Sequence, residues 1–352
     1  MTTTYQSGRR IQGTSTDFGT AGAGIAGVSG GWKELGRTTL GSAGDALDVS
    51  SLADKRYYMV LTNGLNSGAI QGDYRFNSDT GSNYAYRRSI NGGTDGTSTS
   101  ASLIFNGIPE ASAPQFGVGY VANLSTKEKL ILSHTVGRST AGAATAPSRG
   151  ESVGKHSQTS VAINKIDLIN DGSGSWETGS EIVVLGWDDS DTHSTNFWEE
   201  LASVELGSAG DNLSSGTFTA KKYLWVQAFT KNSGAINAKF TFNNDTASNY
   251  SYRYSYDSNA DSTSTSATSF QINVANNNAF YNLFIINNSA TEKLVIGNMV
   301  DQMTAGAGTA PSRLESVSKW ANTSSQITEI DIDNTAAGSF DTGSIIKVWG
   351  SN

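Results

Sequence analysis

The sequence predicts an all-β protein made of two tandem homologous antiparallel β-sandwich, jelly-roll-like domains that follow a Gly-rich N-terminal arm. Two observations predict this fold. The first is a long internal repeat: Leu40-Gly-Ser-Ala-Gly-Asp45 returns as Leu206-Gly-Ser-Ala-Gly-Asp211, and Thr140–Arg149 returns with one change as Thr304–Arg313. The second is a series of short apolar or alternating runs separated by Gly, Asn, Ser and Asp clusters, the pattern of strands joined by turns.

The number of residues between corresponding positions of the two copies, the offset, gives the domain boundaries. It is 166 residues near the start and 164 after the middle, so the second copy has lost two residues in one loop. A repeat this long exceeds a solenoid unit and has the size of a whole domain. We expect an arm at 1–31, a first sandwich (module 1) at 32–188, a linker at 189–195 and a second sandwich (module 2) at 196–352.

The arm has a composition of its own. Asp17–Gly31 is rich in Gly and Ala, follows neither a helical nor a strand period, and has no counterpart before module 2. This composition fits a free tail. The alternative is an arm that packs against a neighbouring subunit, for which Tyr5, Ile11 and Phe18 are candidate contact residues.

Strand candidates are clearest in module 2. Lys222–Phe229 is a nearly continuous apolar run, as expected of a central strand, and Tyr250–Tyr256 alternates with a period of two. In neither copy does an apolar period of 3.6 residues continue for the length of a helix. We expect nine or ten strands in each module, arranged as a sandwich or jelly roll.

Composition excludes several classes of function. The chain has no cysteine, so it has no disulfide and no thiolate metal site. The net charge is −8, only 16% of residues are charged, and no basic stripe offers a surface to nucleic acid. No run of apolar residues is long enough to span a membrane, and we expect no secretory signal, because Met1–Arg10 lacks the apolar run of one.

Catalytic and metal motifs are missing as well. None of the three histidines recurs in the other copy, and His156 aligns with Trp320, so that position takes an aromatic ring rather than a ligand. No nucleophile elbow or phosphate loop occurs. We therefore expect no enzyme activity and no cofactor. The turn residues Asn77 and Asp79, with Asn243 and Asp245 in module 2, are either self-capped turns or weak calcium ligands.

Two further groups of residues are candidates for contacts. Tyr84 and Arg87, with Tyr250 and Arg253 in module 2, lie in alternating strands, with the tyrosines on one face and the arginines on the other. The tyrosines either pack into a sheet or form a platform for sugar rings. The other group is the near-identical small-residue loop that ends at Arg149 in module 1 and at Arg313 in module 2, which has either a shared contact role or only a recent common origin.

The motifs at 32–45 and 76–84, and the closing Thr-Gly-Ser strand of each copy, resemble a module of structural proteins from tailed phages and related viruses, many of them marine. This resemblance implies a jelly-roll-like sandwich at the surface of a virion, and it implies no catalytic residues. We expect decoration or cementing of a capsid, or a fibre or tail component, with other virion proteins or copies of itself as partners. The alternatives are an adhesin that binds host-surface glycans at two sites, and a double jelly-roll major capsid protein.

Overall fold

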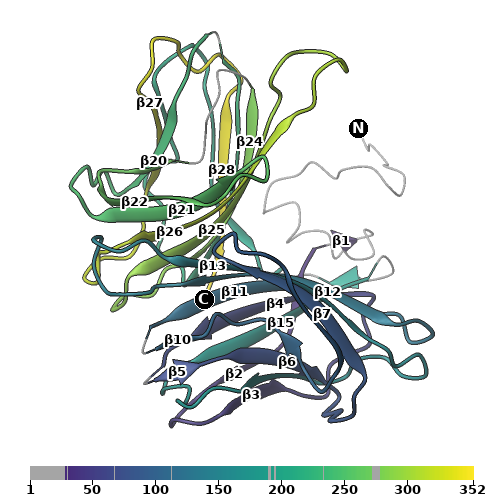
Figure 1. Cartoon of the computed structure of the whole chain (residues 1–352). Helices are drawn as coiled ribbons and strands as arrows, with labels where there is room; N and C mark the ends of the chain where they lie inside the picture. Colours follow the sequence, from purple (N-terminus) through teal and green to yellow (C-terminus); the bar gives the residue numbers. More distant parts are fainter. Residues whose placement is uncertain are drawn as a thin grey trace.

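The computed structural model describes residues 28–29, 31–66, 68–111, 113–188, 192–193, 196–232, 234–271 and 278–352. These residues form strands, bridges, turns and loops, and none of them is helical. The all-β fold class and the two similar antiparallel sandwiches predicted from the sequence are thereby confirmed (Figure 1). The predicted contact residues Tyr5, Ile11 and Phe18 lie outside the described residues.

Module 1 contains one large and one small sheet, both antiparallel. The large sheet has the strand order β2 (Lys33–Thr39), β15 (Glu181–Trp187), β4 (Tyr57–Gly64), β11 (Gln115–Ala122), β12 (Lys129–Gly137), β13 (Ser148–His156), β7 (Tyr84–Ile90), β8 (Gly96–Ala101). The small sheet has the order β3 (Ala46–Val49), β14 (Ile166–Asn170), β6 (Gly72–Phe76), β9 (Ile104–Phe105). A short pair, β5 (Ala69–Ile70) and β10 (Glu110–Ala111), lies beside them.

Module 2 repeats both sheets strand for strand. Its large sheet has the order β17 (Glu199–Glu205), β28 (Ile345–Ser351), β19 (Tyr223–Thr230), β24 (Ala279–Ile286), β25 (Lys293–Asp301), β26 (Ser312–Trp320), β21 (Tyr250–Tyr256), β22 (Ser262–Ala267). Its small sheet has the order β18 (Asn212–Ser214), β27 (Ile330–Asn334), β20 (Ala238–Phe242), β23 (Phe270–Gln271). The offset changes from 166 to 164 between β9 and β11, which locates the deletion in that connection.

Each module closes its own core between its two sheets. In module 1, Tyr58 and Val60 of the large sheet pack with Tyr74 and Leu168 of the small sheet, and all four are buried. The corresponding core of module 2 includes Val226 and Phe240. Because side chains alternate across a strand, the residues between these inward ones face away from the sandwich.

The outward faces of the two large sheets pack against each other and form a third core. This core combines Met59 and Phe116 of module 1 with Tyr223, Phe284 and Leu294 of module 2. Both faces of β4 and β19 are therefore largely buried, which explains the nearly continuous apolar run predicted to be a central strand. Figure 1 shows β11 and β13 of module 1 next to β25 and β26 of module 2.

The N-terminal part of the described chain joins the linker region. β1 (Val28–Ser29) pairs antiparallel with β16 (Thr192–His193), and the backbone N–H of Phe197 donates to the carbonyl of Trp32 at 2.7 Å. The chain that precedes module 1 and the chain that precedes module 2 thus run side by side where the modules meet.

Candidate functional site: two equivalent sheet faces

Module 1 docks one corner of its large sheet onto module 2. The docking corner consists of the outward residues Met59, Leu61, Phe116, Val118, Val136, Val183 and Leu185. On module 2 the partner surface, which we call the covered face, consists of Tyr223, Phe284, Ile286, Leu294, Ile296 and Val317, together with Phe197 and Trp198 at its edge. The six strand residues of the covered face are at most 4% exposed, and Phe197 and Trp198 at its edge are 7% and 8% exposed, so burial of apolar surface is the main stabilising contribution here.

The small-residue loop of module 1, which we call the docking loop (residues 138–149), extends this contact over β21, β22 and β26. The Lys319 ammonium donates to the carbonyls of Arg138 and Thr140 at 3.1 and 2.5 Å. The backbone N–H of Gly142 donates to Glu292 Oε1 at 2.5 Å, and that of Ser266 donates to the Ala143 carbonyl at 2.8 Å.

The later part of the docking loop binds through side chains of β21 as well. Ser251 Oγ donates to the Thr145 carbonyl at 3.0 Å, and Arg253 Nε donates to the Pro147 carbonyl at 2.9 Å. Module 2 therefore binds mainly backbone atoms of the docking loop. The small side chains of the loop allow its backbone to approach module 2 closely.

Two buried ionic groups anchor the ends of the interface. The Arg149 guanidinium donates to Asp261 Oδ1 at 2.6 Å, and the two side chains are only 6% and 2% exposed. Glu181 of module 1 accepts bonds from Tyr223 at 2.7 Å and Lys222 at 3.0 Å. Burial raises the pKa of Glu181, but the bonds from Thr39, Tyr223 and Lys222 outweigh it, so the net pKa lies below its usual value.

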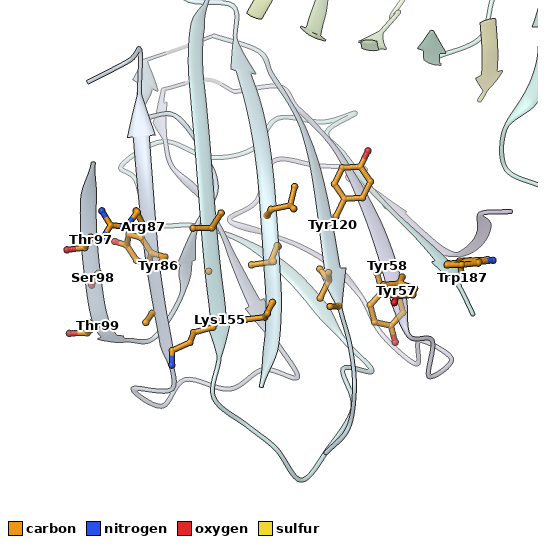
Figure 2. Close-up of a pocket in the computed structure, with 18 of the residues that line it drawn as sticks. Tyr57, Tyr58, Tyr86, Arg87, Thr97, Ser98, Thr99, Tyr120, Lys155 and Trp187 are labelled. Carbon is orange, nitrogen blue, oxygen red and sulfur yellow. The ribbon is translucent and has the colours of Figure 1, made fainter. Parts of the chain in front are cut away.

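The equivalent face of module 1 is open. This open face consists of Tyr57, Tyr120, Ala122, Leu130, Leu132 and Val153, which are the counterparts of the six residues of the covered face. They line a groove of about 1010 Å³ whose rim includes Trp32, Trp187, Arg87 and Lys155. Figure 2 shows Tyr57 and Trp187 side by side at one edge of this sheet, with Arg87 and Thr97–Thr99 at the other.

Corresponding residues of the two faces are similar in type but differ strongly in their exposed fractions. Leu130 is 57% exposed, whereas its identical counterpart Leu294 is 1% exposed. Val153 is 51% exposed, whereas Val317 is 1% exposed. A contiguous apolar patch of this kind is typical of an interaction site.

Of the turn residues that are candidate calcium ligands, the aspartate caps its own turn and the asparagine binds a neighbouring loop. Asp79 accepts bonds from the Gly81 N–H, the Asn83 amide and His156 Nε2, at 2.8 to 2.9 Å. Asn77 Oδ1 accepts from the backbone N–H of Asn164 at 2.8 Å. Burial raises the pKa of Asp79, but the three bonds outweigh it and the net pKa is lowered. The side-chain oxygens of Asp79 and Asn77 thus already accept hydrogen bonds from protein groups.

Module 2 builds the same turn with a different ring. Asp245 accepts from the Ala247 N–H, the Asn249 amide and Trp320 Nε1, the last at 2.7 Å. Asn243 Oδ1 accepts from the Thr328 N–H at 2.8 Å. His156 and Trp320 are interchangeable because each presents a ring N–H to the aspartate of its turn. Each ring also stacks on a tyrosine, His156 on Tyr84 and Trp320 on Tyr250.

Of the two alternatives at Tyr84 and Tyr250, the structure shows packing into the sheet and leaves no sugar platform there. Tyr84 is 1% exposed and Tyr250 is fully buried. Their hydroxyls donate to the carbonyls of Asp79 and Asp245 at 3.2 and 3.1 Å. The tyrosine ladder therefore packs into the sandwich core, and neither residue can contact a partner in this fold.

The four candidate arginines occupy three different environments. Arg149 and Arg253 contact the other module, as described above. Arg87 is 59% exposed, pairs with Asp95 at 3.1 Å and lies on the open face. Arg313, the counterpart of Arg149, is 60% exposed and pairs with Glu315 at 3.4 Å within its own module.

Sequence reasoning did not identify the open face. Leu130, Leu132 and Val153 alternate with inward residues such as Ile131, as strand residues of any sandwich do. Apolar residues on both sides of β4 and β12 were the signal that these strands have a second apolar face.

Among the described residues, no group of three or more His, Asp or Glu side chains is placed to hold a metal ion. The same part of the chain contains no helix long and apolar enough to cross a membrane.

Comparisons with known proteins add little. No protein-family model and no curated protein matches the chain. Among solved structures, domains LG4-5 of the mouse laminin alpha1 chain align over 92% of this chain and 91% of their own, with 10% identity and a TM-score of 0.19. Human GIVD cytosolic phospholipase A2 aligns over 76% of this chain and 33% of its own, with 7% identity and a TM-score of 0.11. Likeness at this level carries no argument about function.

Proposed function

We propose that the chain is a non-enzymatic structural protein of a virus particle, at its surface as capsid decoration or cement or as a fibre or tail component, and that it acts through repeated protein–protein contacts. One observation carries the proposal: the open face of module 1 repeats a face that binds protein in module 2. The viral context is supported by the sequence resemblance of both modules.

The open face suits a protein partner in chemistry as well as in shape. Its centre is apolar, and its rim carries the ion pairs Arg87–Asp95 and Lys155–Glu128, at 3.1 and 3.2 Å. An apolar centre with a polar rim is the usual anatomy of a protein interface. In the covered face the same residue types already bind a protein segment.

Glycan binding is the second candidate, and one observation favours it. Tyr57 and Trp187 stack with ring centroids 5.5 Å apart at the edge of the groove, and Tyr57 is 39% exposed. Exposed aromatic rings of this kind can stack on sugars. This site would replace the two sites expected at Tyr84 and Tyr250.

Incorporation into particles tests the proposal. Particles assembled without this protein are mixed with the wild-type chain, with Leu132→Asp on the open face, or with Leu124→Asp. Leu124 is the matched control because it is as exposed as Leu132, at 47%, and lies outside the groove. We expect Leu132→Asp to lose incorporation and Leu124→Asp to retain it. Full incorporation of Leu132→Asp, with glycan-array binding that Tyr57→Ala and Trp187→Ala abolish, would establish the adhesin instead.

A further inference from the structure

The open face carries the polar groups that hold the docking loop on the covered face, except the Ser251 hydroxyl, whose position is Ala85 in module 1. Lys155, Glu128 and Ser100 of module 1 are identical to Lys319, Glu292 and Ser266 of module 2. The pair Arg87 and Asp95 likewise repeats Arg253 and Asp261. The open face can therefore bind a segment with the backbone course of the docking loop.

Module 2 does not pack its own copy of that segment against the same chain. Its counterpart of the docking loop, residues 302–313, is largely exposed. The docking corner is also more polar in module 2, where Leu61, Val118 and Val183 are replaced by Gln227, Asn282 and Lys347. The other four positions stay apolar, as Trp225, Phe280, Val300 and Trp349. Asn282 is engaged within module 2, because it accepts a bond from Trp225 Nε1 at 2.7 Å. The corner of module 2 therefore has mixed polarity, whereas the centre of the open face is apolar throughout.

The N-terminal arm contains the missing segment. Thr20-Ala-Gly-Ala-Gly24 is identical to Thr304-Ala-Gly-Ala-Gly308 and differs at one position from Thr140-Ala-Gly-Ala-Ala144 of the docking loop. The docking loop binds through backbone atoms, and Gly142 has a φ of +84°, a conformation that favours glycine. Gly22 stands at the corresponding position of the arm. On the open face its N–H would donate to Glu128, and the Thr20 carbonyl would accept from Lys155.

Reach decides which copy supplies the arm. If the arm ran over the open face as the docking loop runs over the covered face, Ala23 would lie at Ser100 in β8. Trp32 directly precedes β2, which is at the opposite edge of the sheet. Seven strand spacings of about 4.8 Å separate these edges by roughly 34 Å. Residues 23 to 32 extend at most ~32 Å, and Val28–Ser29 are already held against β16. The arm of the same chain falls short.

We propose that the open face of one copy binds Thr20–Gly24 from the N-terminal arm of a second copy, in the way that the covered face binds the docking loop. This inference rests on the proposed function and names the partner: another molecule of the same chain. Each copy offers one arm and one open face, so the contact is head-to-tail and builds either rings or open chains.

Mixing two full-length variants tests the assignment by sedimentation velocity. Gly22→Val disables the arm, because a β-branched residue disfavours the required positive φ, and leaves the open face intact. Leu132→Asp disables the open face and leaves the arm intact. We expect the wild type to self-associate with rising concentration, and each variant alone to associate at least tenfold more weakly. Their equimolar mixture should form a 1:1 dimer, because one working arm meets one working face.

The controls are Gly13→Val in the arm and Leu124→Asp on the surface, and both should behave as wild type. A wild type that stays monomeric at its highest soluble concentration would overturn the proposal. A mixture without heterodimer would also overturn it, because the contact would then lie within one chain. If Leu132→Asp blocks incorporation into particles while Gly22→Val is incorporated normally, the arm assignment is wrong and the proposed function stands with another protein as partner.

Discussion

The repeat provides a direct comparison between a covered and an open face, since Leu130 and Leu294 are the same residue at the same position of the two modules. Leu294→Ala removes a side chain that is 1% exposed in the core between the modules. Loss of a buried leucine side chain costs about 2–5 kcal/mol, because transfer free energy is lost and a cavity remains. Leu130→Ala removes a side chain that is 57% exposed, and its cost should stay within about 0.5 kcal/mol.

Thermal unfolding measures the difference. An unfolding entropy of ~2.1 cal/mol/K per residue gives roughly 0.7 kcal/mol/K for 352 residues, so a loss of ~3 kcal/mol lowers the Tm by about 4 °C. We expect this shift for Leu294→Ala and less than about 1 °C for Leu130→Ala, measured by calorimetry at a concentration where the chain is monomeric. The pair Val317→Ala and Val153→Ala should follow the same order. Equal shifts within each pair would refute the packing of the two large sheets described here.

The remaining predictions concern charge and metal. Arg149→Ala leaves the buried carboxylate of Asp261 without its closest partner and should cost about 3–5 kcal/mol, whereas Arg313→Ala should cost less than about 0.5 kcal/mol in the same denaturant titration. Burial raises the pKa of Asp73 to about 7, so its contribution to stability is greatest below pH 4 and declines as pH rises to 7. Asp73→Asn should therefore stabilise the chain at pH 8 by up to about 4 kcal/mol and give no gain at pH 4; an equal gain at both pH values would contradict this assignment. EDTA should change the Tm by less than about 2 °C, because the oxygens of Asp79 are bonded within their turn; a fall of ~5 °C would indicate a structural cation.

Much of the fold could be predicted from the sequence because the repeat and the period-two pattern report local geometry. The deletion was correctly expected in one loop, and the alternation at Tyr250–Tyr256 correctly marked one strand. The expected nine or ten strands per module were too few, since the described residues alone form fourteen from β2 to β15 and twelve from β17 to β28. Polar strands such as Ser262–Ala267 and very short ones such as Ile104–Phe105 lack an apolar pattern, and only pairing with their neighbours makes them strands.

The site could not be predicted in the same way, because it depends on a difference between two nearly identical copies. No local pattern tells Leu130 from Leu294, and only the packing of the modules covers one and leaves the other open. For the docking loop the sequence left a shared contact role and a recent common origin both open, and it does not reveal that the module 1 copy binds and the module 2 copy is exposed. The sequence left packing and contact both open at Tyr84, because a period of two does not say which face of the strand is the core.

Photo-cross-linking can show directly whether the open face of one copy binds the arm of another. A benzophenone amino acid is placed at position 132 in chains labelled with a heavy isotope, which are then mixed with unlabelled chains and irradiated after assembly. We predict cross-linked peptides that pair residue 132 of a heavy chain with residues 20–24 of a light chain, because the open face of one copy binds the arm of another. Cross-links to the arm of the same isotope label alone, or to residues 302–313 of module 2, would contradict it.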